Sequence, residues 1–225
     1  MAAEGFDTYP QLRQRSRVYR DGFRRRADMV IGLLRAAGVG GADGAFRLLD
    51  VGTADGIMLR AFAEAFPRSV RVGLEASGEL VEVARADGHE VVEGRAETLP
   101  FGDDAFDVAT VVATLKHVPE AGRALAELRR VLVPGGVLVV ADPTPWGLRL
   151  GLWRGHFDPR WLAHRWSLAA TRRHLEAAGF TVVRGVRYMP LPLDVPGSRP
   201  LEALGRGLGL SRAFLQQATL ARAAP

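Results

Sequence analysis

The sequence of 225 residues lacks cysteine entirely and contains a single lysine. Without cysteine the chain can form no disulfide, no thiolate nucleophile and no cysteine-ligated zinc site. Long apolar runs are missing too, because no stretch reaches the roughly 18 apolar residues of a membrane-spanning helix. No apolar signal core follows Met1. We therefore expect a cytoplasmic protein with no transmembrane segment and no bound metal.

The charge is basic and almost wholly arginine. Thirty basic residues oppose 25 acidic ones, which gives a formal net charge of +5, and eight of the arginines lie between Gln11 and Arg35. A solvated helix face explains this segment more simply than an acidic partner or an anionic membrane surface, although a peripheral membrane contact is compatible with it. No basic run is interleaved with aromatic residues, so no nucleic-acid partner is expected. A monomer and a homodimer are both compatible with the sequence.

Apolar patterning predicts alternating strands and helices in the first two thirds of the chain. Such alternation indicates a parallel sheet with right-handed crossovers. The predicted strands are 46–51, 70–74, 90–93, 106–115 and 137–141, and the predicted helices are 18–37, 57–66, 78–87 and 119–132.

The alternation is interrupted after the fifth predicted strand. Residues 142–166 are rich in Trp, Pro and Arg, and this composition makes the segment a candidate lid. A helix over 168–178, ended by a left-handed cap at Gly179, and a strand over 180–188 are predicted next. Residues 214–223 are expected to return as an antiparallel last strand.

The sharpest motif is the turn that follows the first predicted strand. Asp50 and Val51 end that strand, and Gly52-Thr53-Ala54-Asp55-Gly56 leads into a helix. In doubly wound sheets this turn lies at the crevice where ligands bind, and its glycines allow a positive φ and close approach to a bulky cofactor. The following helix also presents free N–H groups. A tight turn without a ligand is the alternative.

Glu75 is a second candidate, 25 residues after Asp50 and at the end of the next strand. A carboxylate there can accept two hydrogen bonds from ribose hydroxyls, as in dinucleotide folds with a spacing of about 20 residues. Its alternative role is that of an acid at the N-terminus of the next helix.

Four blocks of sequence now resemble one family. They are LLDVGTADG at 48–56, GLEAS at 73–77, EGRAETLPFGDDAFDVATVVATLKHV at 93–118 and ELRRVLVPGGVLVV at 127–140, with a weaker block HLEAAGF at 174–180. Together they resemble the class I methyltransferases that depend on S-adenosylmethionine, a broad group that includes ubiquinone and menaquinone biosynthesis methyltransferases.

The resemblance implies an α/β, Rossmann-like, doubly wound fold. Its sheet would be mostly parallel and seven-stranded with an antiparallel last strand, and helices would cover both faces. Residues 1–45 would be a basic helical extension or cap, 46–141 the S-adenosylmethionine-binding core, and 142–225 a lid with a helix and strands that complete the same domain.

The resemblance also implies cofactor contacts residue by residue. Glu75 would hold the ribose, Arg95 and Ala96 would flank the adenine, and the Val112 backbone would meet the amino-acid end. The methionyl moiety would lie among Asp50, Gly52, Ala54, Asp55 and Gly56. The product would be S-adenosylhomocysteine.

Two positions depart from the family pattern. Ala54 replaces the family's middle glycine, at a cost of about 1 kcal/mol if φ is positive there. Arg95 replaces a common aspartate and cannot accept a hydrogen bond from the adenine amino group. A backbone carbonyl could substitute, Arg95 could stack on the ring, or the affinity could be lower.

On the acceptor side, His117 is the candidate general base because its ordinary pKa is near neutrality. Its alternative role is to pack or to position the following helix. Candidate substrate or lid residues are Tyr9, Tyr19, Trp146, Trp153 and His156, for which plain packing is an equal alternative. Their aromatic and apolar character favours a small organic or lipid-like acceptor.

Two other motifs and two other functions fit the sequence less well. Asp142 to Trp146 resembles an amino-group methylase signature but follows the wrong strand, and Asp103-Asp104 fits a turn better than a metal pair. A nicotinamide-dependent oxidoreductase would require Gly-x-Gly-x-x-Gly, whereas three residues separate Gly52 from Gly56. A cofactor-binding protein without turnover is the remaining alternative, given Ala54 and Arg95.

Overall fold

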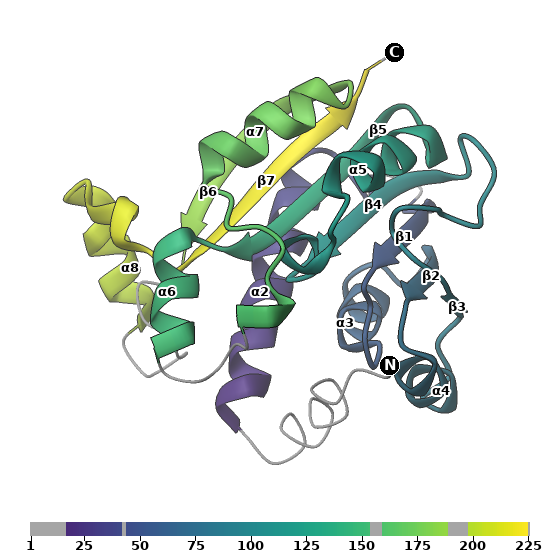
Figure 1. The fold of residues 1–225 in the computed structure, drawn as a ribbon, viewed down its shortest axis with the longest axis horizontal. Coiled ribbons are helices and arrows are strands. Elements are labelled where there is room, and N and C mark those ends of the chain that lie inside the picture. The colour runs from purple at the N-terminus through teal and green to yellow at the C-terminus, as the bar shows by residue number, and fades with distance from the viewer. Residues whose placement is uncertain (1–16, 42–43, 154–158, 189–197, 225) are drawn as a thin grey trace.

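The computed structural model describes residues 17–41, 44–153, 159–188 and 198–224. Their strands form one seven-stranded sheet in the order β3-β2-β1-β4-β5-β7-β6 (Figure 1). All pairs from β3 to β5 are parallel, and β7 is antiparallel to both neighbours. This arrangement confirms the predicted fold class, with the last strand inserted between β5 and β6.

The strands are β1 (Arg47–Val51), β2 (Val70–Glu75), β3 (Val91–Glu93), β4 (Phe106–Val112), β5 (Leu132–Pro143), β6 (Phe180–Tyr188) and β7 (Gln216–Ala223). The helices are α2 (Arg17–Ala36), α3 (Ile57–Ala65), α4 (Gly78–Ala86), α5 (Ala121–Val131), α6 (Pro145–Trp153), α7 (Leu168–Ala177) and α8 (Ser198–Gly207). Three 3-10 helices, η1 (Leu115–His117), η2 (Pro159–Trp161) and η3 (Leu210–Ala213), complete these elements.

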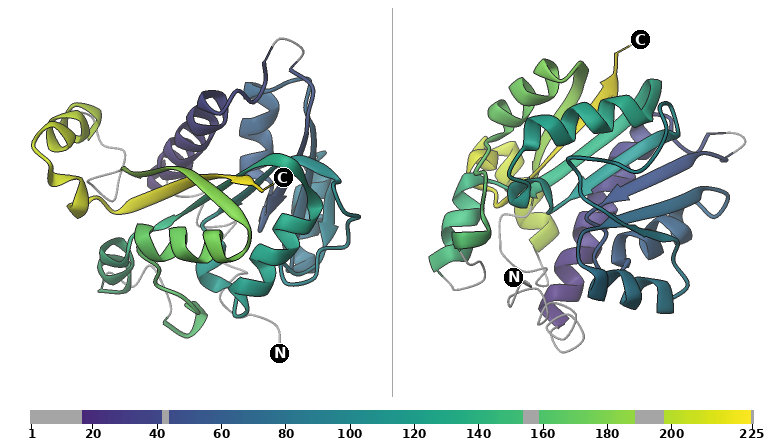
Figure 2. Two further views of the ribbon diagram at one scale, coloured as in Figure 1. Left: turned by 90° about the horizontal axis from the view of Figure 1, so that it is seen from above. Right: turned by 45° about the vertical axis from the view of Figure 1, so that its right-hand side comes forward.

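Two apolar layers cover the sheet, because successive strand residues face opposite sides. Leu48 packs with α2, α3 and α4 on one face, and its neighbour Leu49 packs with α5 and α7 on the other. Figure 2 shows helices on both sides of the strands. Helix α2, the basic helix of the sequence, buries Val30 and Leu34 against the sheet and is thus part of the core.

Several boundaries differ from the predicted ones. Strand β4 ends at Val112 instead of 115, because Ala113 adopts a positive φ of 58° and the chain turns into η1. Strand β5 begins at Leu132, directly after α5, instead of at 137. The candidate lid contains the helix α6, which apolar periodicity did not reveal because Gly147 and Gly151 interrupt its sequence.

No helix within the described ranges is both long enough and apolar enough to cross a membrane. Tyr9 and His156 lie outside the described residues, and Tyr19 lies on α2 at a position where only the backbone is described.

Candidate functional site

The candidate site lies along the edge of the sheet where β1, β2, β4 and β5 end. These strands are parallel, so their carboxyl ends meet at the same edge. Asp50 and Glu75 come from β1 and β2, and Val112 and Asp142 come from β4 and β5. The structure therefore brings the two predicted carboxylates and Val112 together on one edge.

Glu75 is bound to the loop that follows β1. The Ala54 N–H donates to Glu75 Oε2 at 2.9 Å, and the N–H groups of Ala76 and Ser77 donate to Oε1 at 2.9 and 3.0 Å. The carboxylate thus lies at the start of α4, as one of its two predicted roles requires, and also reaches across to the glycine-bearing loop. A carboxylate oxygen can accept a further hydrogen bond beside each of these.

Asp50 is a buried carboxylate on β1. Its side chain is 1% exposed, and Oδ1 accepts a hydrogen bond from Thr110 Oγ1 at 2.6 Å. Oδ2 is buried without a hydrogen-bond partner among the described residues. Burial raises the pKa of Asp50 to about 6, against which the Thr110 hydrogen bond acts, and the Glu75 charge raises it further. An unpartnered carboxylate oxygen at this edge is a polar atom available to a ligand.

Because the pKa of Asp50 is raised in the folded protein, the effect of this residue on the free energy of unfolding depends on pH. Between pH 3.8 and about 6 the folded state holds a proton that the unfolded state releases, so the contribution of Asp50 to stability falls as the pH rises and is constant above the folded pKa. Relative to the wild type, Asp50→Asn should gain roughly 2 kcal/mol in unfolding free energy between pH 4.5 and 7. Urea unfolding at both pH values measures this, and a difference independent of pH would contradict it.

The glycines of the loop have the predicted positive φ and are also required by close contacts within the protein. Gly52 and Gly56 have φ values of 74° and 80°, as the turn requires. A Cβ on Gly52 would lie 2.2 Å from the Thr114 side chain, and one on Gly56 would lie 2.3 Å from the His89 ring. Both the backbone conformation and the close approach of these side chains therefore require glycine at positions 52 and 56.

Ala54 takes the left-handed conformation that the family pattern reserves for glycine. Its φ is 52°, and its N–H is the donor that Glu75 holds. Replacing Ala54 with glycine should raise the free energy of unfolding by about 1 kcal/mol, because glycine adopts this φ without the Cβ penalty. The matched control Ala86→Gly, on the exposed end of α4, should lose about 0.5–1 kcal/mol. Thermal unfolding of both variants tests the sign, and a loss at both positions would contradict the strain.

The turn after β4 forms the wall opposite Glu75. Ala113 has a φ of 58° and donates its N–H to Ala141 O at 2.6 Å. Thr114 Oγ1 donates to Val112 O at 3.1 Å and contacts the Gly52 carbonyl oxygen at 3.4 Å. The loop after β1 and the turn after β4 thus each contain an alanine with a positive φ, Ala54 and Ala113. Such backbone strain concentrates at functional sites.

The buried side chain of Lys116 stabilises the turn after β4. The sequence did not identify this residue as a candidate. Its side chain is 5% exposed, and Nζ donates to Ala113 O and lies 3.5 Å from Asp142 Oδ1. Burial lowers the pKa of Lys116 to about 8, and the Asp142 charge opposes this shift. One available signal was that Lys116 is the only lysine of the chain. Asp142 begins the segment that resembles an amino-group methylase signature but follows the wrong strand.

The remaining candidates lie at more open positions. Arg95 is exposed and forms an ion pair with Glu97 at 3.5 Å, whereas Ala96 is buried beside it. His117 is half-buried in η1, at the mouth of the β4 turn. Trp146 and Trp153 on α6 are 53% and 82% exposed. Within the described ranges no cluster of three His, Asp or Glu residues could hold a metal ion.

Known proteins share both sequence and fold with this chain. Residues 49–140 match a family model described as a methyltransferase domain. The demethylmenaquinone methyltransferase of Thermus thermophilus is 36% identical over 120 residues, which cover 50% of this chain and 54% of the relative. Another relative, an uncharacterized protein in a Streptomyces fradiae transposon, is 43% identical over a segment covering only 29% of its length. The chain thus spans about half or less of these relatives.

Solved structures extend the likeness beyond the matched segment. A chain from the Haloferax volcanii complex of the Trm112 methyltransferase activator with a methyltransferase has a TM-score of 0.64 and 26% identity, over 80% of this chain and 82% of that one. The position of the candidate site and the sequence blocks of this chain are consistent with the match over residues 49–140. Residues 49–140 are thus similar in sequence to a methyltransferase domain, and the chain shares its fold with the Haloferax volcanii protein.

Proposed function

We propose that the protein transfers the methyl group of S-adenosylmethionine to a small organic or lipid-like acceptor, with residues 46–141 as the cofactor-binding core. The observation that carries the proposal is the fixed Glu75 carboxylate, which accepts the Ala54 N–H across the loop at the ends of β1 and β2. A carboxylate beside a strained turn, at the edge where doubly wound sheets bind ligands, supports a role as acceptor for ribose hydroxyls.

The residues present fit the cofactor. Glu75 would hold the ribose, and the unpartnered Asp50 Oδ2 beneath the loop would accept from a polar group of the methionyl moiety, directly or through water. Gly52, Ala54, Asp55 and Gly56 would form the loop wall, and the Val112 carbonyl end of β4 the wall opposite. Ala96 would pack on the adenine, while Arg95, already paired with Glu97, would stack on or flank it.

Bound S-adenosylmethionine supplies a methyl group that is already activated by its sulfonium charge. The protein must therefore align the acceptor, exclude water and, for an oxygen or carbon acceptor, remove a proton. His117 is the proposed base, because it is half-buried at the mouth of the site. Its backbone N–H donates to Thr114 O at 2.8 Å, which fixes its position relative to the cofactor wall.

A quinone-type ring is the first acceptor class to test. The Thermus thermophilus relative is a demethylmenaquinone methyltransferase, and it is 36% identical to this chain over 120 residues, about half of each protein. Methyl transfer from labelled S-adenosylmethionine to naphthohydroquinones, with and without an aliphatic chain, should exceed transfer to protein and RNA. Activity confined to protein or RNA would overturn the proposal, and Glu75→Ala provides the inactive control.

A function without methyl transfer is the second candidate. The [4+2]-cyclase SpnF shares the fold with a TM-score of 0.64 at 23% identity, over 88% of this chain and 81% of that one, so the fold alone also serves other chemistry. If the protein binds S-adenosylmethionine tightly but methylates none of the acceptors above, this candidate is favoured.

A further inference from the structure

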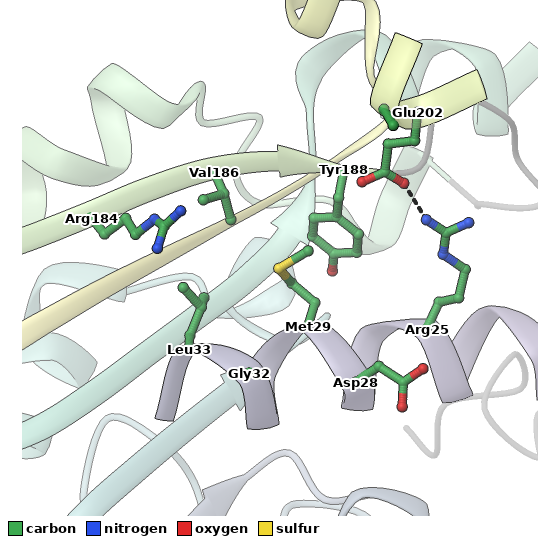
Figure 3. A pocket seen from close by; sticks show the side chains of 10 residues that line it. Arg25, Asp28, Met29, Gly32, Leu33, Arg184, Val186, Tyr188 and Glu202 are labelled. Carbon is green, nitrogen blue, oxygen red and sulfur yellow. Dashed lines mark hydrogen bonds and ion pairs between the residues drawn. The ribbon is translucent and has the colours of Figure 1, made fainter. Parts of the chain in front are cut away.

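A separate hollow of about 450 Å³ lies between α2, β6 and α8, within the size range of ligand pockets (Figure 3). Helix α2 contributes Met29, Gly32 and Leu33 to its lining, and β6 contributes Arg184, Val186 and Tyr188. None of these residues belongs to the cofactor edge described above. The hollow is therefore a second candidate binding site.

The strand order separates this hollow from the cofactor site. Strand β6 lies three strands beyond β4 in the sheet. At about 4.8 Å per strand the separation is roughly 14 Å. A small ligand in the hollow would thus not touch the wall formed by Val112, and still less the Glu75 carboxylate, which lies two strands further away on β2.

Gly32 keeps the hollow open. It lies in the interior of α2, where glycine costs about 1 kcal/mol relative to alanine. A Cβ at this position would meet no atom within 4 Å, so packing against the protein does not require glycine. The missing side chain instead leaves room in the hollow that Gly32 lines.

The two arginines that line the hollow differ in whether they have an ion-pair partner. Arg25 and Glu202 form a buried ion pair that joins α2 to α8 at one end (Figure 3). Arg184 is exposed at the other end and makes no hydrogen bond or ion pair with any described residue. Asp28 lies beside Arg25, and its carboxylate is directed away from Arg184 in Figure 3. Arg184 is therefore the unneutralised cation of the lining.

The wall beside Arg184 is apolar. Met29 and Leu33 on α2 face Val186 on β6, and Tyr188 lies behind them with its hydroxyl directed towards α2 (Figure 3). That hydroxyl is buried without a hydrogen-bond partner among the described residues. A guanidinium beside an apolar wall matches a ligand with an anionic head and an apolar body.

We propose that this hollow binds a small amphiphilic anion, with a carboxylate or phosphate head on Arg184 and an aliphatic or aromatic body over Met29, Leu33 and Val186. The site is independent of the methyl-transfer proposal, because it shares no residue with the cofactor edge. Its ligand need not be the methyl acceptor.

Calorimetric titration with octanoate, octyl phosphate, octylamine and inorganic phosphate tests the site. Octanoate or octyl phosphate should bind, the stronger of the two identifying the head group, while octylamine and inorganic phosphate should bind at least tenfold more weakly. Arg184→Gln should weaken the binding about tenfold, as expected for loss of a charge-assisted contact. The matched control Arg173→Gln, an exposed arginine on α7, should bind as the wild type does.

Gly32→Leu fills the hollow and should abolish binding while the cooperative thermal transition remains. If this variant does not fold, Arg184→Gln still decides the question. Saturating S-adenosylhomocysteine should leave the affinity for octanoate unchanged. Equal binding by wild type and Arg184→Gln, equal binding of octylamine and octanoate, or no binding of either octyl anion would overturn the inference, whatever the result for methyl transfer.

Discussion

Replacing Glu75 with alanine is expected to weaken the binding of S-adenosylhomocysteine by about 100-fold or more. The variant loses the proposed ribose acceptor, and the N–H groups of Ala54, Ala76 and Ser77 lose the acceptor that fixes the loop. Each hydrogen bond to a charged group contributes about 1.5–3 kcal/mol, so two to the ribose account for a factor of this size. Calorimetry gives the dissociation constant directly.

One further variant tests whether binding requires the charge of Glu75, and another tests whether the effect is specific to this position. Glu75→Gln keeps an oxygen for the backbone N–H groups and should bind with intermediate affinity. Glu82→Ala removes an exposed carboxylate from the neighbouring helix α4, where it pairs with Arg85, and should leave the affinity unchanged. An affinity of Glu75→Ala within threefold of the wild type would contradict the assigned role.

Replacing Lys116 with methionine is expected to lower the free energy of unfolding by about 3–5 kcal/mol. Methionine approximates the length of the lysine stem but leaves Asp142 with a buried charge and no cation at 3.5 Å, and it frees the Ala113 carbonyl oxygen. Burial already raises the pKa of Asp142, and removal of Lys116 removes the nearest charge that opposes this shift. Urea unfolding measures the loss.

A double-mutant cycle distinguishes the buried pair from simple packing. Lys116→Met combined with Asp142→Leu removes both charges and should recover most of the loss, because no unpaired charge remains. The matched control Arg172→Met breaks an exposed i,i+4 pair with Glu176 and should cost less than about 1 kcal/mol. A loss below 1 kcal/mol for Lys116→Met, or no recovery in the double variant, would contradict the anchoring role.

The alternation of apolar segments predicted most of the sheet because strand and helix periods differ along the first two thirds of the chain. The positions of β1, β2 and β3 follow from short apolar runs between helical segments. Periodicity missed the end of β4, since nothing in the apolar run 106–115 marks the positive φ of Ala113. It also missed α6, where two glycines and exposed tryptophans hide the helical pattern.

The cofactor edge was predicted in outline and not in detail. Asp50 and Glu75 were identified because each lies at the carboxyl end of a predicted strand and carries a charge. Lys116 and Thr114 were not, because their roles depend on contacts with residues far away in the sequence, with Asp142 in one case and with Gly52 in the other. Only the folded chain brings these groups together.

The most direct test of the account is a calorimetric titration of the wild-type chain with S-adenosylhomocysteine and, separately, with NAD. A site built on Glu75 and the loop from Asp50 to Gly56 predicts saturable binding of one S-adenosylhomocysteine per chain, lost in Glu75→Ala, and no heat from NAD. Binding of NAD, or no binding of S-adenosylhomocysteine by a folded wild-type chain, would contradict it.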